Sequence, residues 1–227
     1  NALGGPGAEL KSAQRRHARF VNTTMMVTGL GAAVSDGLAD GRVVSGVGGQ
    51  YNFVAMAHAL PEARSILCLR STRQAQGGLT SNIVWSYGHA TIPRHLRDIV
   101  VTEYGIADLR GRTDREIVSA LVEVMDARFQ ESFVADAMRA GKLPSDYRIP
   151  ETARENRSGT LRARFAVARE RGAFPELPFG SDLTAEEIEL ARALKWLETA
   201  LSSWRGRFGL ARWLLAATPS AAALQPA

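Results

Sequence analysis

The sequence has little cysteine and little lysine. Cys68 is the only cysteine, so neither an intrachain disulfide nor a cysteine metal cluster can form, and we expect no metal. It stands in the apolar run 66–69, where a buried, unreactive thiol is expected. Lys11, Lys142 and Lys195 are the only lysines among 28 basic residues, so arginine supplies most of the positive charge.

The sequence also lacks a long hydrophobic run. Residues 206–223 are rich in apolar side chains but are interrupted by Arg207, Arg212 and Pro219, and no basic-then-apolar signal sequence opens the chain. We therefore expect no membrane association and a cytoplasmic location. Hydrophobic residues make up 45% of the 227 residues, which suffices for a globular core.

The formal net charge is +5, and the arginines are scattered among acidic residues. A nucleic-acid-binding protein usually concentrates its basic residues on one face. The arginine-rich stretch 154–171, with Leu161, Phe165 and Ala168 on one side, could touch RNA or a membrane, but we interpret it as a solvated helical face. We expect no nucleic-acid partner, whereas acidic small molecules are compatible with the charge.

Short apolar runs alternate with helical patterns between residues 20 and 140. Strands are expected at 20–28, 43–44, 66–69, 83–85 and 98–102. Helices are expected from Asn52 to the residue before Pro61, after the capping pair Thr113 and Glu116, and through Phe129, Phe133 and Ala137. This alternation predicts an α/β fold with a mostly parallel sheet.

The flanking segments differ from this pattern. Residues 1–17 are predicted to be a flexible linker, residues 18–145 the α/β domain and residues 146–227 a helical extension. In the extension, Thr184 and Glu187 form a second capping pair. The helix that follows this pair carries an apolar stripe, which we expect to pack against another part of the protein. The stripe consists of Leu190, Leu194, Leu197, Leu201 and Trp204. Residues 71–81 are predicted to be a polar, flexible loop, and residues 108–111 a turn.

Residues 43–53 read VVSGVGGQYNF, a short apolar run followed by a loop with Gly46, Gly48 and Gly49. Such a loop lets backbone N–H groups approach an anion or a polarised carbonyl, although it can also be a simple tight turn. A second turn, 103–105, follows the strand expected at 98–102. In a parallel sheet both turns would lie at the carboxyl edge, where ligands bind.

Two long motifs in this sequence resemble those of a known protein family. SGVGGQYNF (45–53) and IVVTEYGIADLRGRT (99–113), with the Ser-x-Ile-Val segment 81–84 between them, resemble the C-terminal domain of the acetyl-CoA hydrolase/transferase family, which includes acetate, succinyl and 4-hydroxybutyrate CoA-transferases. The resemblance extends from about residue 18 to residue 140.

The resemblance implies a CoA-transferase α/β fold (NagB/RpiA/CoA-transferase-like) of which this chain is the second half. It implies that coenzyme A, as the acyl-CoA thioester, binds in a cleft with the N-terminal half of the same protein, with a small carboxylate as acceptor. A homo-oligomer is expected. The implied oxyanion donor is the backbone N–H of Gly105. The implied substrate contacts are Gly46, Val47, Gly48, Gly49 and Gln50. Ser81, after Gly77 and Gly78, could contact the cofactor or equally cap its loop.

One residue departs from the family pattern. The nucleophilic glutamate of the family follows an Asn, two small residues and an apolar residue, and here Met26 occupies that place. A thioether cannot form an acyl anhydride. The chain could therefore hydrolyse thioesters with activated water, use Glu103 as a substitute carboxylate, or be a non-catalytic acyl-CoA-binding or regulatory domain. A structural carboxylate that bonds backbone N–H groups is the simpler interpretation of Glu103.

Other polar residues give weaker signals. His58, His89 and His95 do not have the spacing of a ligand set, and His89 is expected in a solvated loop. A hydrolase triad from the pair 35–36 and a histidine lacks the G-x-S-x-G turn. Arg70 and Arg73 follow a strand end and could meet CoA phosphates.

Overall fold

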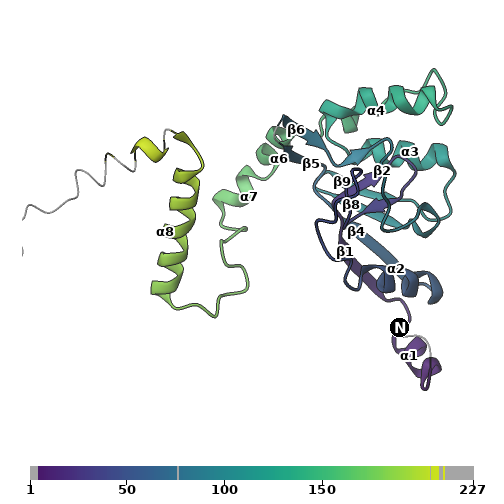
Figure 1. Cartoon of the computed structure of the whole chain (residues 1–227), viewed down its shortest axis with the longest axis horizontal. Helices are drawn as coiled ribbons and strands as arrows, with labels where there is room; N and C mark the ends of the chain where they lie inside the picture. Colours follow the sequence, from purple (N-terminus) through teal and green to yellow (C-terminus); the bar gives the residue numbers. More distant parts are fainter. Residues whose placement is uncertain (1–4, 76, 205, 210–211, 213–227) are drawn as a thin grey trace, which may run out of the picture. The chain divides into compact units, whose positions relative to one another are not determined.

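The computed structural model describes residues 5–75, 77–204, 206–209 and 212 (Figure 1). Its contacts separate two compact units, which meet in sequence between Val167 and Ala168. This division lies beyond residue 145, where the sequence suggested that the α/β domain ends.

The first unit is built on a four-stranded sheet in the order β1-β4-β8-β9. The strands are β1 (Arg19–Thr23), β4 (Arg64–Cys68), β8 (Ile99–Thr102) and β9 (Gly105–Asp108). The first three are mutually parallel and β9 is antiparallel to β8, which confirms the expected α/β class with a mostly parallel sheet. Because the strands run the same way, β1, β4 and β8 all end at one edge, here called the carboxyl edge.

The single strand expected at 20–28 is wrong, because the chain changes sheets in its middle. Thr24 donates its backbone N–H to Cys68 beside β1, whereas Met25 donates to Val34 at 2.9 Å. β2 (Met26–Thr28) then pairs with β3 (Ala33–Val34) and β7 (Ile83–Val84) in a second sheet. The bend at Thr24 and Met25 therefore lies directly at the carboxyl edge.

Two further expectations are corrected. Residues 71–81 form not a flexible loop but an antiparallel hairpin of β5 (Thr72–Ala75) and β6 (Gly78–Ser81). The strand expected at 43–44 is limited to an isolated bridge between Val43 and Gly37, and Val43 is 75% exposed. An exposed valine has no packing to extend a strand, so the glycine loop is held by other contacts.

Helices lie against the sheet (Figure 1), and its residues Leu67, Val100 and Ala107 are buried. α2 (Gln50–Ala59) packs against β1 and β4, and it begins after Gly49 rather than at Asn52. α3 (Asp114–Glu123) packs against β9 and is followed by α4 (Ala127–Arg139). The capping box of Thr113 and Glu116 is confirmed, and Ile117, Leu121 and Val124 of this segment are buried.

The remaining helices are short or lie in the second unit. α1 (Ala8–Gln14) occupies part of the segment expected to be a linker. η1 (Arg94–Leu96) is a 3-10 turn before β8, and α5 (Glu151–Arg154), α6 (Ser158–Arg164) and α7 (Ala166–Glu170) follow the α/β domain. In the part of the chain that the structure describes, no helix is both long and apolar enough to cross a bilayer.

The second unit contains α8 (Ala185–Leu201), which starts with the expected capping box of Thr184 and Glu187. Its apolar stripe was expected to be packed, but Leu190 and Leu194 are each 61% exposed within this chain. The stripe is therefore a surface of the chain as the structure describes it.

Candidate active site

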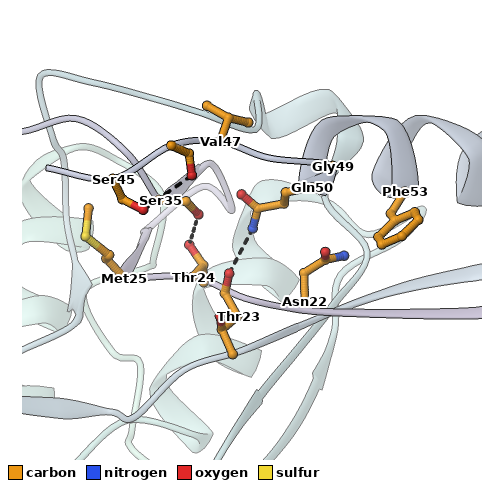
Figure 2. A pocket seen from close by; sticks show the side chains of 11 residues that line it. Asn22, Thr23, Thr24, Met25, Ser35, Ser45, Val47, Gly49, Gln50 and Phe53 are labelled. Atoms are coloured by element: carbon orange, nitrogen blue, oxygen red, sulfur yellow. Dashed lines mark hydrogen bonds between the residues drawn. The ribbon is translucent and has the colours of Figure 1, made fainter. Parts of the chain in front are cut away.

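A cavity of about 390 Å³ lies at the carboxyl end of β1 (Figure 2). One wall is the chain from Asn22 to Met25, where β1 ends and the bend begins. The opposite wall is the glycine loop and the start of α2, and Ser35 closes one side. From the glycine loop and α2 the lining residues are Ser45, Gly46, Val47, Gly49, Gln50 and Phe53.

Two side-chain amides in this cavity have unused hydrogen-bonding groups. Gln50 is 6% exposed, and its Nε2 donates to the backbone oxygen of Thr23 at 3.0 Å (Figure 2). Its Oε1, and the Nδ2 of Asn22, are buried with no hydrogen-bond partner among the described residues. Buried polar groups are usually paired, so an unused acceptor and an unused donor in one cavity indicate a place for a polar ligand.

The glycine loop keeps its backbone open to the cavity mouth. Gly48 has a φ of +57°, a conformation in which a side chain is strained. A Cβ at Gly46, Gly48 or Gly49 would meet no atom of the described chain within 4 Å. The loop is held from behind, because the backbone N–H groups of Val44 and Ser45 both donate to the backbone oxygen of Asp36.

Asp36 in turn is fixed by a polar cluster. Its carboxylate accepts hydrogen bonds from Thr91 Oγ1 and, at 3.0 Å, from His89 Nε2. The bond from Thr91, followed by that from His89, lowers the pKa of Asp36 below its usual range. His89 lies in a loop, as expected, but its side chain is only 36% exposed, and a Cβ on Gly37 would meet its ring at 2.8 Å.

These residues do not form a hydrolase triad. The Ser35 hydroxyl donates to Thr24 Oγ1 at 3.0 Å, and Thr24 donates to the backbone oxygen of Val34 at 2.8 Å. His89 is bonded to Asp36, the residue next to Ser35, so the histidine does not serve as the base of the serine. The hydrogen bonds of the Ser35 and Thr24 hydroxyls instead fix the bend at Thr24 and Met25, which forms one wall of the cavity.

The turn after β8 is held by Ser71, which follows β4. Glu103 is exposed, and its Oε2 accepts the backbone N–H of Ser71 at 2.8 Å. The buried Ser71 hydroxyl accepts the backbone N–H of Asp126 at 2.7 Å. Glu103 therefore makes the kind of contact that a structural carboxylate makes. Gly105 pairs with Thr102 across the turn and begins β9.

Tyr104 anchors the same turn to the start of α4. Its hydroxyl donates to Asp126 Oδ2 at 2.9 Å, and Arg128 donates to both oxygens of that carboxylate. Burial, followed by the bond to Asp126, raises the pKa of Tyr104. Burial raises the pKa of Asp126, but the bonds from Arg128 and Tyr104 outweigh it and leave the pKa lowered. These hydrogen bonds hold the turn against the start of α4.

Met26 lies outside the cavity that the glycine loop lines. It is 3% exposed and lines a second cavity of about 410 Å³ together with Arg70 and Arg73. Thr24 and Met25 line both cavities and form the wall between them.

Ser81 lines neither of these cavities, because its hydroxyl donates to the backbone oxygen of Ile83 at 2.7 Å within a local turn. Of the residues expected to contact substrate, Gly46, Val47, Gly49 and Gln50 line the first cavity, whereas Gly48 does not. The structure sets Met26 on the far side of the bend.

The sequence assigned no part in the cavity to Asn22 or Thr24, which entered only the pattern before Met26, or to Ser35, which was considered only for a hydrolase triad. It also gave no sign that Ser71 holds the turn after β8. Their polar character at strand ends was visible, but the sheet change at Thr24 was not. Within the described residues, no group of three or more histidine, cysteine or acidic side chains could hold a metal ion.

The fold and the site together define an α/β domain with a candidate ligand cavity at the carboxyl edge of a mostly parallel sheet. Residues 8–137 match the acetyl-CoA hydrolase/transferase C-terminal domain family, and the chain belongs to this family. The resemblance seen in the two sequence motifs is thereby confirmed.

Similar proteins include enzymes that are named as CoA-transferases. The probable butyrate:acetyl-CoA coenzyme A-transferase of Syntrophomonas wolfei is 37% identical over 101 residues, which are 43% of this chain and 23% of that protein. The 4-hydroxybutyrate coenzyme A transferase of Clostridium kluyveri is 34% identical over 117 residues, which are 50% and 27% of the two chains. The chain thus spans about a quarter of the length of these relatives.

Among solved structures, a point mutant of RipA matches with a TM-score of 0.50 and 30% identity. The match covers 55% of this chain and 28% of the RipA chain. The similarity is therefore confined to part of each chain.

Proposed function

We propose that this chain is the C-terminal half of an enzyme that transfers CoA between an acyl-CoA and a carboxylic acid, or that hydrolyses the thioester. The observation that carries the proposal is the cavity between the end of β1 and the glycine loop, in a chain of this family. A volume of about 390 Å³ lies in the range of small-molecule sites.

The unused amides suit the arm of coenzyme A. The pantetheine arm contains amide groups, each with one donor and one acceptor. Asn22 Nδ2 offers a donor and Gln50 Oε1 an acceptor, so together they complement one such amide. The backbone of Gly46 to Gly49 then lies against the acyl-CoA, with Val47 at the mouth of the cavity.

The nucleophile is the open part of the proposal. Met26 stands where the resemblance implies glutamate, and its thioether cannot carry an acyl group. We propose that Glu103 serves as the substitute carboxylate or that water attacks the thioester directly, with the backbone N–H of Gly105 as oxyanion donor. Supporting this, Glu103 and Gly105 follow β8 at the same sheet edge as the end of β1.

The N-terminal half of the protein is the proposed partner that completes the cleft. Apolar side chains stand exposed around the cavity: Val43, Val44, Val47, Tyr51 and Phe53. Exposed apolar groups that gather in one region mark an interaction surface. The exposed stripe of α8 supports a homo-oligomer, and a cytoplasmic location belongs to the same proposal.

The test uses the full-length protein with acetyl-CoA and an isotopically labelled carboxylate. Thiol release reports hydrolysis, and label entering the thioester reports transfer. Glu103→Ala should abolish transfer if Glu103 is the nucleophile, while transfer that survives this change removes Glu103 from that role. Absence of both reactions in the wild type would contradict an enzymatic function.

The second candidate is a non-catalytic acyl-CoA-binding or regulatory domain, and Met26 is the residue that favours it. Thermal stabilisation by CoA without turnover would support this candidate. The variant Met26→Glu then offers a direct comparison, because gain of transfer on adding the carboxylate would show that the rest of the catalytic site is intact.

A further inference from the structure

A third cavity, of about 420 Å³, lies at the edge of the sheet opposite to the carboxyl edge. It is built where α2 ends, where η1 leads into β8 and where β9 leads into α3. Its lining residues are His58, Arg94, His95, Arg97, Arg110, Gly111, Arg112 and Asp114. Four arginines and two histidines thus face one space, with Asp114 as the only acidic lining residue.

Near this cavity, positively charged side chains outnumber the carboxylates that pair with them. Asp114 accepts a bond from Lys142 at 2.7 Å and lies 3.9 Å from both Arg94 and Arg97. The bond from Lys142, together with the nearby arginines, lowers the pKa of Asp114. Arg112 also pairs with Glu116 at 3.6 Å and Arg110 with Asp98. The four lining arginines and Lys142 thus share three carboxylates, which leaves an excess of positive charge.

The pKa of His58, in α2, is also affected by the positive charge near this cavity. His58 Nε2 lies 3.0 Å from the backbone oxygen of Leu96, and burial followed by the charge of Arg110 lowers its pKa. Burial disfavours a charge of either sign, so only the contribution of Arg110 indicates a positive potential at His58.

Two arginines of the cavity wall have side-chain nitrogens without a hydrogen bond to the described residues, those of Arg94 exposed and the Nε of Arg110 buried. Arg110 spends its outer nitrogens on Asp98 and on the backbone oxygens of Ala63 and Ala57, but its buried Nε has no hydrogen-bond partner in the described part of the chain. Within the part of the chain that the structure describes, the 57% exposed Arg94 makes a single charge contact, at 3.9 Å from Asp114. The start of the ten-residue helix α3 adds a positive dipole end to the same wall.

We propose that this cavity binds the phosphate groups of a small molecule that carries at least a diphosphate. Arginine matches phosphate oxygens with paired N–H donors, and the volume exceeds that of a single phosphate. The site is separate from the glycine loop, because β4 alone spans five residues, roughly 16 Å, between the two edges. The proposal stands without the proposed CoA chemistry.

The test is calorimetric titration of the full-length protein with inorganic pyrophosphate. Arg94→Ala should weaken binding about tenfold, since it removes one charge-assisted contact. The matched control is Arg115→Ala, which removes the same charge from an exposed position of α3 outside the cavity. Equal affinities of the two variants, or no binding of pyrophosphate by the wild type, would overturn the proposal.

Phosphate groups can come from a separate ligand or from coenzyme A itself, and competition distinguishes these sources. If CoA displaces pyrophosphate and Arg94→Ala weakens both, the cavity holds the phosphate end of CoA. If pyrophosphate binds with CoA present, the ligand is a separate phosphorylated compound. Pyrophosphate binding without any acyl-CoA turnover would sustain this site while contradicting the enzymatic proposal.

Discussion

The side-chain Nε2 of Gln50 donates a 3.0 Å hydrogen bond to the backbone oxygen of Thr23, which joins the first residue of α2 to the last residue of β1. This bond fixes the distance between the two walls of the candidate active site. The other end of the same amide, Oε1, remains for a ligand.

Replacing Gln50 with methionine keeps the volume and removes the amide. We expect a loss of about 1 kcal/mol in the free energy of unfolding, because the bond to Thr23 disappears. We also expect weaker CoA binding if Oε1 contacts the pantetheine arm. Urea denaturation and calorimetry measure the two effects. Gln14→Met, at an exposed position of α1, should change neither quantity.

Ser71→Ala should destabilise the protein by about 1–3 kcal/mol, since the fully buried hydroxyl accepts the backbone N–H of Asp126 and the variant leaves that donor unpaired. Chemical denaturation measures the loss. Ser132→Ala removes a hydroxyl from an exposed position of α4 and serves as the control. A cost equal to that of the control would show that the contact of Ser71 does not stabilise the turn.

Tyr104 makes stability depend on alkaline pH. Its pKa in the folded protein lies above the ordinary value of 10.0, so the folded state holds the proton more tightly than the unfolded state. The contribution of Tyr104 to the free energy of unfolding is fully present below pH 10.0 and is lost as the pH rises above that value. Tyr104→Phe should remove that part of the alkaline decline, whereas Tyr51→Phe, at a 50% exposed position, should not. Denaturation midpoints across this pH range provide the measurement.

Asp98→Asn should destabilise the protein by roughly 3–5 kcal/mol. The carboxylate is 1% exposed and accepts bonds from Arg64, Arg110 and the backbone N–H of Ser65. Its neutral replacement leaves two arginines without their buried counter-charge. Asp108→Asn is the comparison, because Asp108 also bonds Arg64 but is 47% exposed. Similar losses for both variants would contradict a special role of the buried carboxylate.

The sequence predicted the elements whose signals are local. Thr113 and Thr184 each begin a helix with the glutamate three residues later, and these capping boxes need no distant partner. The bend at Met25 depends on Val34, and the hairpin of β5 and β6 depends on pairing across its turn. Such contacts leave no periodic trace in the chain, so the cavity wall at Asn22 and Thr24 could not be predicted.

Thr24 and Met25 are a shared partition between two neighbouring chambers, one beside the glycine loop and one around Met26. Enlarging or shrinking the Met25 side chain must reshape both chambers at once. A substitution at Met25 that changes which ligand one chamber accepts should therefore also change which ligand the other accepts. Only residues that line a single chamber can alter the ligand preference of that chamber alone.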